Sequence, residues 1–301
     1  MLGSSIAEAW HRLRPDDELV ALTRDDLDLR DRARVDRLFG ELRPDAVIHA
    51  AAKVGGISAK LANPTDYLLD NLEIDSSVFQ AAIRNEVPEL LYIGSAAVYP
   101  AEVGQPIPES ALLSGRLESA NEGYGIAKLA GQKLAEYASA QYGFSYRTAL
   151  PSNLYGPNDD FSPSHGHLIA AAIGKVHSAM VAGDPSVGVW GDGTARREFT
   201  YAPDLASWLV LQLGRLATWP SALNLGVGHD NSIAEYYRVA LDVVGFSGEL
   251  EFDASKPAGV PQRLLDSSAA RALGWDPATP LRDGMASAYD SYLNSETRGP
   301  R

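Results

Sequence analysis

Short apolar runs alternate along the chain with segments of helical periodicity. The apolar runs predict β-strands at 18–22, 45–50, 90–93, 146–150, 187–190, 222–225 and 249–252. Apolar residues spaced three and four positions apart predict helices at 31–42, 65–85, 121–142, 203–215, 232–244 and 280–294. Strands that alternate with helices are typical of a parallel sheet covered on both faces. We therefore predict an α/β fold with a doubly wound parallel sheet.

The second half of the chain is less regular than the first, and no low-complexity linker separates them. The two halves are therefore predicted to be interleaved. In open parallel sheets ligands bind beyond the carboxyl ends of the strands, so we expect a ligand cleft there.

Composition narrows the class of protein. The chain has 301 residues, of which 45% are hydrophobic, and no run approaches the roughly 20 apolar residues that span a bilayer. The first residues, Met1 to Ser5, lack the basic and apolar regions of a signal peptide. No cysteine is present, which excludes disulfides and thiolate chemistry, and the net charge of −13 argues against nucleic-acid binding. We predict a cytoplasmic enzyme without a metal.

One tyrosine has the spacing of a proton donor. Of 13 tyrosines, only Tyr124 is followed four residues later by a lysine, Lys128, so that both side chains share one helix face. A free tyrosine titrates near about pH 10, and a neighbouring ammonium is expected to make it more acidic. An ordinary solvated pair on a helix is the alternative interpretation of this spacing.

The alternative is weakened by the preceding strand. The apolar run 90–93 ends in Gly94 and Ser95, which indicates a buried strand that delivers a hydroxyl at its carboxyl end. Ser95, Tyr124 and Lys128 together predict a site that reduces a carbonyl group.

Seven motifs carry a family resemblance. They are Ala50-Ala-Ala-Lys-Val-Gly-Gly-Ile57, Gly94-Ser-Ala-Ala-Val-Tyr-Pro100, Tyr124-Gly-Ile-Ala-Lys128, Asn153-Leu-Tyr-Gly-Pro157, Trp190-Gly-Asp-Gly-Thr194, Arg197-Glu-Phe199 and Asp253-Ala-Ser-Lys-Pro257. Their order and spacing resemble those of the GDP-L-fucose synthase family of extended short-chain dehydrogenases. That resemblance implies epimerisation at C3 and C5 of a GDP-linked 4-keto-6-deoxysugar, followed by reduction at C4 with NADPH.

The same resemblance implies a Rossmann-type sheet with a smaller C-terminal substrate-binding domain. The dinucleotide-binding domain is expected at 1–157 and 200–228, and the sugar-nucleotide domain at 158–199 and 229–301. Relatives have a first strand and a glycine turn before their first helix, of which Gly3 alone matches here. We expect that strand to be missing from the printed chain because of a mis-chosen start or a truncation. Without it, NADPH is expected to bind more weakly.

A second departure from the family concerns proton transfer. Ala97 stands where relatives carry a cysteine that acts as one epimerisation acid or base, and His167 matches the other. Alanine carries no proton, whereas inverting a carbon next to a ketone needs two placed groups or a mobile water. His167 is expected to titrate in the ordinary histidine range, and either His165 or His167 is expected to contact the substrate. Epimerisation is therefore predicted to be lost or changed.

Further site residues are implied by the resemblance. For the cofactor they are Gly3, Arg24, Ala51, Lys128, Asn153 and His167. Arg24 matches the residue that contacts the 2′-phosphate of NADPH. Asp25 and Asp26 beside it are suited to the 2′-hydroxyl of NADH, so NADH is the alternative cofactor. For the sugar nucleotide they are Lys53, Ala97, Asn153, Lys175, Trp190, Arg197 and Lys256.

Three functions are compatible with these residues. The leading prediction is an NADPH-dependent C4 reductase of a GDP-linked 4-keto-6-deoxyhexose, in which Tyr124 donates the proton and Ser95 polarises the ketone. The second is complete GDP-L-fucose synthase activity, and the third is a non-catalytic protein that binds nucleotide sugars. Relatives pair through the helices at 65–85 and 121–142, which implies a homodimer.

Overall fold

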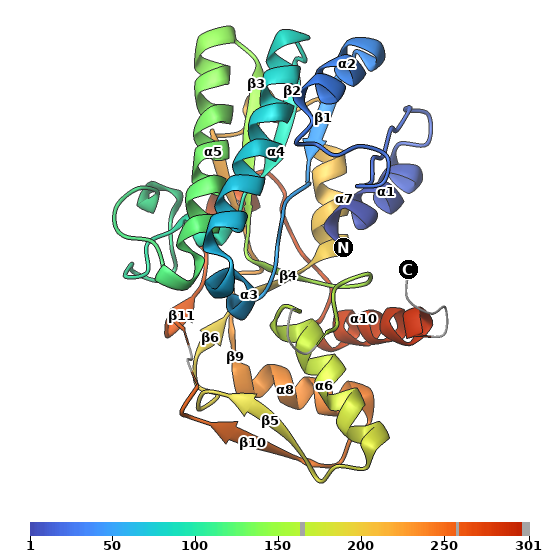
Figure 1. The fold of residues 1–301 in the computed structure, drawn as a ribbon, viewed down its shortest axis with the longest axis vertical. Helices are drawn as coiled ribbons and strands as arrows, with labels where there is room; N and C mark the ends of the chain where they lie inside the picture. Colours follow the sequence, from blue (N-terminus) through green and yellow to red (C-terminus); the bar gives the residue numbers. More distant parts are fainter. Residues whose placement is uncertain (163–165, 257–258, 297–301) are drawn as a thin grey trace.

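A four-stranded parallel sheet forms the centre of the larger part of the molecule (Figure 1). The computed structural model describes residues 1–162, 166–256 and 259–296. The strands are β1 (Ala46–His49), β2 (Glu89–Ile93), β3 (Ser145–Pro151) and β8 (Ala222–Leu225), in the order β1-β2-β3-β8. Each neighbouring pair is parallel, which confirms the predicted parallel sheet.

Helices cover both faces of this sheet because side chains along β2 alternate between two cores. Leu90 and Tyr92 pack with α2 (Arg32–Leu42), α4 (Pro64–Arg84) and α5 (Glu122–Tyr142). Leu91 and Ile93 face the core on the other side, to which α7 (Ala202–Gln212) contributes. The helix α1 (Leu2–Leu13) packs against α7. The doubly wound arrangement is therefore as predicted.

A smaller unit lies below the sheet unit in Figure 1. Its core joins α6 (Leu168–Ala182), α8 (Ile233–Val244) and α10 (Leu281–Glu296) to the parallel pair β5 (Ser186–Trp190) and β10 (Glu249–Asp253). The remaining elements are short: α3 (Ile57–Ala62), α9 (Ser268–Ala272), β4 (Asn153–Tyr155), β6 (Arg196–Arg197), β7 (Phe199–Tyr201), β9 (Asn231–Ser232) and β11 (Gln262–Arg263). The exact domain limits stay a prediction.

Glycines let α5 approach the sheet closely. A Cβ added at Gly131 would overlap the Tyr92 hydroxyl, and one added at Gly125 would lie 2.7 Å from the carbonyl oxygen of Ala97. A helix face without side chains at these points brings the backbone of α5 against β2 and the turn after it. Tyr124, beside Gly125, is thereby placed at the carboxyl end of β2.

The strand predicted at residues 18–22 is wrong. The structure has no strand there, and Val20 and Leu22 are 46% and 43% exposed. An extended segment becomes a strand only when a neighbour accepts its backbone hydrogen bonds. Within the described residues β1 is bonded to β2 alone, and no described strand stands beside β1 to pair with this segment.

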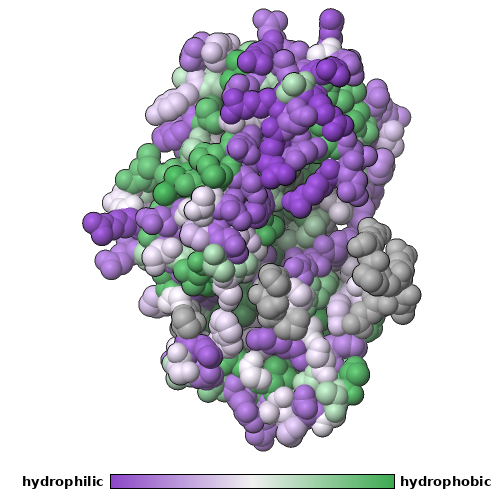
Figure 2. Space-filling view, viewed as in Figure 1, coloured by the Kyte–Doolittle hydropathy of each residue, from purple (hydrophilic) through white to green (hydrophobic). Residues whose placement is uncertain are grey.

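Apolar side chains remain exposed on α4 and α5. We call them the α4–α5 face: Leu69, Ile126, Leu134 and Tyr137, between 38% and 60% exposed. Figure 2 shows hydrophobic residues along the left side of the molecule, over α5, beside a mostly hydrophilic surface. No helix of the described residues is both long enough and apolar enough to cross a membrane.

Candidate active site

Ser95 and Tyr124 meet at the carboxyl end of β2. Ser95 follows the strand and caps a single 3-10 turn (Ala96–Val98), where its hydroxyl oxygen accepts a hydrogen bond of 3.2 Å from the Ala97 amide. Tyr124 lies in the first turn of α5, is 8% exposed, and is near enough to Ser95 for that side chain to lower its pKa. The structure therefore places two of the three predicted reductase residues close together.

The electrostatic setting of Tyr124 differs from the expectation. Burial raises the pKa of Tyr124 to about 12, the hydrogen bond with Ser95 lowers it, and the negative charge of Asp75 raises it. The sequence predicted a pKa lowered by Lys128. That direction is wrong here because desolvation of the phenolate outweighs every favourable contact.

Lys128 is fully buried beneath this pair. Its Nζ donates a hydrogen bond of 3.0 Å to the carbonyl oxygen of Ile93 and lies 4.5 Å from the centre of the Tyr92 ring. Burial lowers the pKa of Lys128, and the carboxylate of Asp75 raises it. The ammonium is therefore turned toward β2 and α4 and not toward the ring of Tyr124.

A buried carboxylate balances Lys128. Asp75 on α4 accepts hydrogen bonds from the Tyr92 hydroxyl at 2.5 Å and pairs with Nε2 of His49 at 2.9 Å. Burial alone would raise the pKa of Asp75, but Lys128, His49 and Tyr92 together hold it below its ordinary value. The result is an ionised network inside the sheet unit, directly behind the predicted catalytic residues.

A second lysine lies beside Tyr124. Lys60 on α3 places its Nζ 4.5 Å from the centre of the Tyr124 ring and donates a hydrogen bond of 3.0 Å to Oδ1 of Asn121. Burial lowers the pKa of Lys60 to about 8, and Glu118 raises it. This amine therefore titrates near neutral pH within the candidate site.

His167 precedes α6 and lies near the same lysine. The pKa of His167 is lowered to about 4 by burial and by the charge of Lys60, which together outweigh the opposite effect of Asp160. The expected ordinary titration range is therefore wrong, because desolvation and a neighbouring cation both oppose protonation. His165 falls outside the described residues.

Lys53 and Asn153 are engaged with protein groups. Nζ of Lys53 is 2.7 Å from the carboxylate of Asp70 and 3.7 Å from that of Asp66, on α4. Nδ2 of Asn153 donates to the carbonyl oxygen of Glu198 at 3.1 Å, which ties β4 to β7. Lys53 also borders a surface pocket of roughly 460 Å³, whose other lining residues are Ser58, Ala59, Ala62, Asn63, Asp66 and Tyr67.

The remaining predicted substrate residues belong to the smaller unit and its junction with the sheet unit. Lys175 lies 5.9 Å from the ring centre of Trp190, which is 53% exposed at the end of β5. Burial lowers the pKa of Arg197 on β6, and Glu118 raises it. Lys256 is exposed in a turn after β10. Lys175 and Trp190 thus form a pair.

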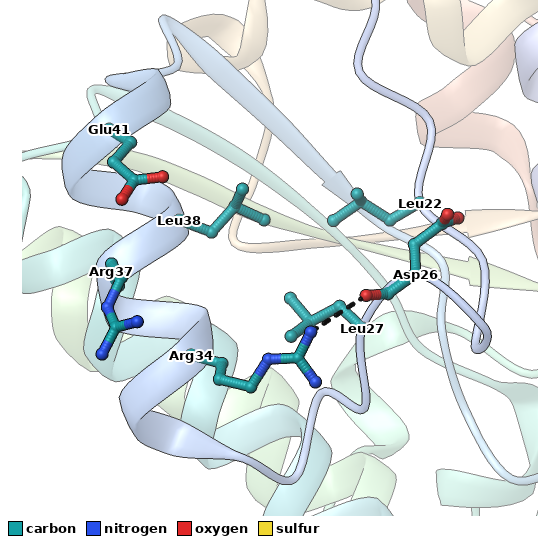
Figure 3. Close-up of a pocket in the computed structure, with 7 residues that line it drawn as sticks. All are labelled: Leu22, Asp26, Leu27, Arg34, Arg37, Leu38 and Glu41. Atoms are coloured by element: carbon teal, nitrogen blue, oxygen red, sulfur yellow. Dashed lines mark hydrogen bonds between the residues drawn. The ribbon is translucent and has the colours of Figure 1, made fainter.

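The predicted cofactor residues lie on separate elements. Gly3 is exposed near the start of α1, Ala51 follows β1, and Arg24 lies in an exposed turn. A pocket of roughly 200 Å³ lies next to that turn, lined by Leu22, Asp26, Leu27, Arg34, Arg37, Leu38 and Glu41 (Figure 3). Arg34 crosses it to donate to the backbone oxygen of Asp26 at 3.3 Å. None of the predicted site residues lines this pocket.

Sequence reasoning missed Lys60, Asp75 and His49. Asp75 had a detectable signal, because it lies four residues after buried Asn71 and four before buried Phe79 on one helix face. An acidic residue on such a face indicates a buried partner. Lys60 had no comparable signal, since α3 is short and carries no buried residue.

Comparisons with known proteins agree with this geometry. Residues 1–226 match the NAD dependent epimerase/dehydratase family. The chain is 44% identical to the GDP-L-fucose synthase of Escherichia coli K12, over 99% of this chain and 95% of that protein.

Solved structures are similar as well. A GDP-6-OMe-4-keto-L-xylo-heptose reductase from C. jejuni matches with a TM-score of 0.90 and 29% identity, covering 97% of this chain and 94% of that chain. The GDP-mannoheptose C4 reductase MlghC from Campylobacter jejuni, with NADP bound, matches with a TM-score of 0.86 and 30% identity, covering 97% and 95%.

Proposed function

The chain belongs to the NAD dependent epimerase/dehydratase family, in its GDP-L-fucose synthase group, and we propose that it reduces the C4 ketone of a GDP-linked 4-keto-6-deoxyhexose with NADPH. The observation that carries this proposal is the proximity of Ser95 and Tyr124 at the carboxyl end of β2, with Lys128 one helical turn further on. The named relatives act on GDP-linked sugars, and two of the similar structures are reductases of such sugars.

The start of α1 fits a dinucleotide. Its first turn has no acidic residue and no side-chain cap, and the space around Gly3 is open where a Cβ would stand. Helix amino termini of this kind hold phosphate groups through their free backbone amides. We assign the pyrophosphate to this turn and the 2′-phosphate to Arg24, with Ala51, Lys128 and Asn153 toward the nicotinamide half.

The turn at Arg24 favours NADPH over NADH. Oδ2 of Asp26 accepts hydrogen bonds from the amide and the hydroxyl of Thr23, at 2.8 Å and 2.6 Å, so one of its two oxygens is engaged within the turn. The exposed guanidinium of Arg24 remains the group suited to a phosphate.

The side chains of this protein supply the proton and orient the ketone. When bound, NADPH supplies two electrons and a hydrogen to C4. Tyr124 transfers its proton to the C4 oxygen, and the hydroxyl of Ser95 donates a hydrogen bond to the same oxygen. Lys128, whose Nζ donates to the carbonyl oxygen of Ile93, is assigned to the nicotinamide ribose.

The sugar nucleotide is assigned to the junction of the two units. A GDP diphosphate needs cations, which a chain of net charge −13 must gather locally. Arg197 and Lys175 are partly desolvated there, and Trp190 offers an exposed ring against which a base or sugar packs. Lys53, Lys256 and His167 complete the proposed set.

Loss of epimerisation is part of the proposal. Ala97 carries only a methyl group, in a turn whose backbone lies against Gly125, the residue after Tyr124. His167, with its pKa lowered to about 4, is neutral at pH 7 and is therefore suited to act as a base but not as an imidazolium acid. Inversion at C3 or C5 needs a base on one face of the sugar and an acid on the other. The residues therefore favour direct reduction at C4.

The test is an incubation of the protein with GDP-4-keto-6-deoxymannose and NADPH. We expect NADPH to be consumed and the product to be a GDP-linked 6-deoxy-D-hexose with unchanged C3 and C5. GDP-L-fucose as the major product would instead establish the complete synthase. Binding of the sugar nucleotide without NADPH consumption would indicate a non-catalytic protein.

A further inference from the structure

Two lysines approach the predicted proton donor, and they make different contacts. Lys128 lies over the ring of Tyr92, whereas Lys60 lies over the ring of Tyr124, each at 4.5 Å. The cation that lies over the ring of the reacting tyrosine is therefore a residue of α3, outside the Tyr-x-x-x-Lys spacing.

Lys60 is held in place by the residue that precedes α5. Oδ1 of Asn121 accepts its hydrogen bond at 3.0 Å, while Nδ2 of Asn121 donates to Glu118 at 2.9 Å. Asn121 comes three residues before Tyr124, so the residue that binds the lysine directly precedes the helix that carries the tyrosine. Their relative position is thus fixed by the start of the same helix.

The charge of Lys128 is already balanced. Its ammonium donates to Ile93 and is paired electrostatically with Asp75, which accepts further hydrogen bonds from Tyr92 and His49. A positive charge matched by a nearby carboxylate exerts little net field on a third group. The positive charge of Lys60 is compensated by Glu118. That carboxylate accepts a hydrogen bond from Asn121, which lies between it and the lysine.

We propose that Lys60 is an electrostatic positioning residue for the reduction, whose ammonium stabilises the negative charge left on Tyr124 when its proton moves to the C4 oxygen of the sugar. This inference rests on the proposed reductase function. In that step the O–H bond of Tyr124 breaks, an O–H bond forms on the C4 oxygen, and NADPH supplies two electrons and a hydrogen to C4. The phenolate then regains a proton from water.

The pH dependence of the step follows from the groups that face Lys60. They are Tyr124 in the first turn of α5, Glu118 in the segment before that helix, and His167 before α6. The pKa of Lys60 is lowered to about 8. The pKa of Tyr124 is raised to about 12, and that of His167 is lowered to about 4. Of Lys60, Tyr124 and His167, Lys60 alone therefore changes charge between pH 7 and pH 9.

The test compares single-turnover reduction rates of Lys60→Met, Lys60→Arg and the unmutated protein from about pH 7 to about pH 9. A matched control is Lys133→Met, because Lys133 lies 5.9 Å from the ring centre of Tyr137 on the outer side of α5. A cation beside a partly desolvated ring is worth about 10-fold in rate. We expect Lys60→Met to be about 10-fold slower at pH 7 and Lys133→Met to be unchanged.

The shape of the pH profile separates electrostatics from packing. The unmutated protein should lose about 10-fold in rate through pH 8, Lys60→Met should show no such step, and Lys60→Arg should keep the rate to pH 9. A rate for Lys60→Met equal to that of the unmutated protein at pH 7, with the step near pH 8 retained, would overturn the proposal.

A second measurement does not depend on turnover. In protein labelled with ¹³C at the tyrosine Cζ, the Tyr124 signal, assigned through Tyr124→Phe, should shift near pH 8, and the shift should vanish in Lys60→Met. Absence of the shift in the unmutated protein would contradict the pairing of Lys60 with Tyr124. If the shift is present but no sugar is reduced, the proposed function fails while the pairing stands.

Discussion

The carboxylate of Asp75 lies 2.9 Å from Nε2 of His49, and neither side chain is exposed by more than 3%. Tyr92 donates a hydrogen bond to Asp75, and its ring lies against the ammonium of Lys128. A buried ammonium is stable only when a carboxylate or several acceptors surround it. Asp75 therefore contributes to the site although it touches neither Ser95 nor Tyr124.

Asp75→Asn is expected to lower the free energy of unfolding by roughly 3 kcal/mol at pH 7, because it leaves the buried charge of Lys128 uncompensated. Urea denaturation measures the change. Asp70→Asn on the same helix is the control, since the ion pairs of Asp70 lie near the surface and each is worth roughly 1 kcal/mol or less.

Acid should remove the contribution of Asp75 to the free energy of unfolding. Its pKa in the folded protein is lowered, so its stabilisation is present above the unfolded value of about 4 and is lost as the pH falls through the folded value. The stability gap between the unmutated protein and Asp75→Asn should therefore narrow in acid. A gap that widened would contradict this assignment.

Tyr124→Phe should remove most of the reduction while it leaves sugar-nucleotide affinity nearly unchanged. The ring and its packing remain but the transferable proton is gone, and a general acid contributes about 10²- to 10⁴-fold. Stopped-flow rates and titration calorimetry measure the two quantities. Tyr137→Phe, on the exposed side of α5, is the control. Near-normal turnover of Tyr124→Phe would remove this residue from the mechanism.

Ala97 should limit proton exchange at C3 and C5 of the sugar. In D₂O we expect little deuterium to enter these carbons during C4 reduction, because the methyl group carries no proton and His167 reaches one face at most. Mass spectrometry of the product measures the uptake. Ala97→Cys should increase it, and extensive labelling of both carbons by the unmutated protein would show that another group has taken over this role.

His167 should titrate far below the ordinary histidine range. Its pKa is lowered to about 4 by burial and by Lys60, so proton NMR should give a midpoint near that value, with the signal assigned through His167→Asn. In Lys60→Met the midpoint should rise, because one of the two opposing influences is gone. An unchanged midpoint would mean that Lys60 and His167 do not interact.

The α4–α5 face should hold two copies of the chain together. Four apolar side chains exposed on neighbouring helices suit a twofold four-helix contact. Light scattering should give twice the chain mass, and the double variant Leu69→Glu and Leu134→Glu should be monomeric. Val181→Glu, an equally drastic change at an exposed residue of α6, should leave the mass unchanged.

Most of the sheet unit could be predicted because its strands and helices carry strong local patterns. The segments at 90–93 and 121–142 appear as β2 and α5, each with its first residue shifted by one position. The segment 18–22 has the same kind of apolar run, yet its state depends on a neighbouring strand and not on its own residues. Local pattern therefore identifies strands only where the partner is also present.

The positions of Ser95, Tyr124 and Lys128 in the fold could be predicted, but their electrostatic setting could not. Helical spacing placed Tyr124 and Lys128 on one face, as found, and the strand end supplied Ser95. Spacing could not reveal that Lys128 turns toward Ile93, because that direction is set by Asp75 on a different helix. The orientation of Lys128 thus depends on a carboxylate from a distant segment, and the amine that lies over the Tyr124 ring is that of Lys60.

The glycines of α5 also bear on how the site assembles during folding. Gly123, Gly125 and Gly131 each cost a helix roughly 1 kcal/mol relative to alanine, so the segment has little tendency to be helical alone. Their contacts with Pro64, Ala97 and Tyr92 exist only after α4 and β2 are in place. The helix that carries Tyr124 and Lys128 is therefore expected to form late, on a surface already built by its neighbours.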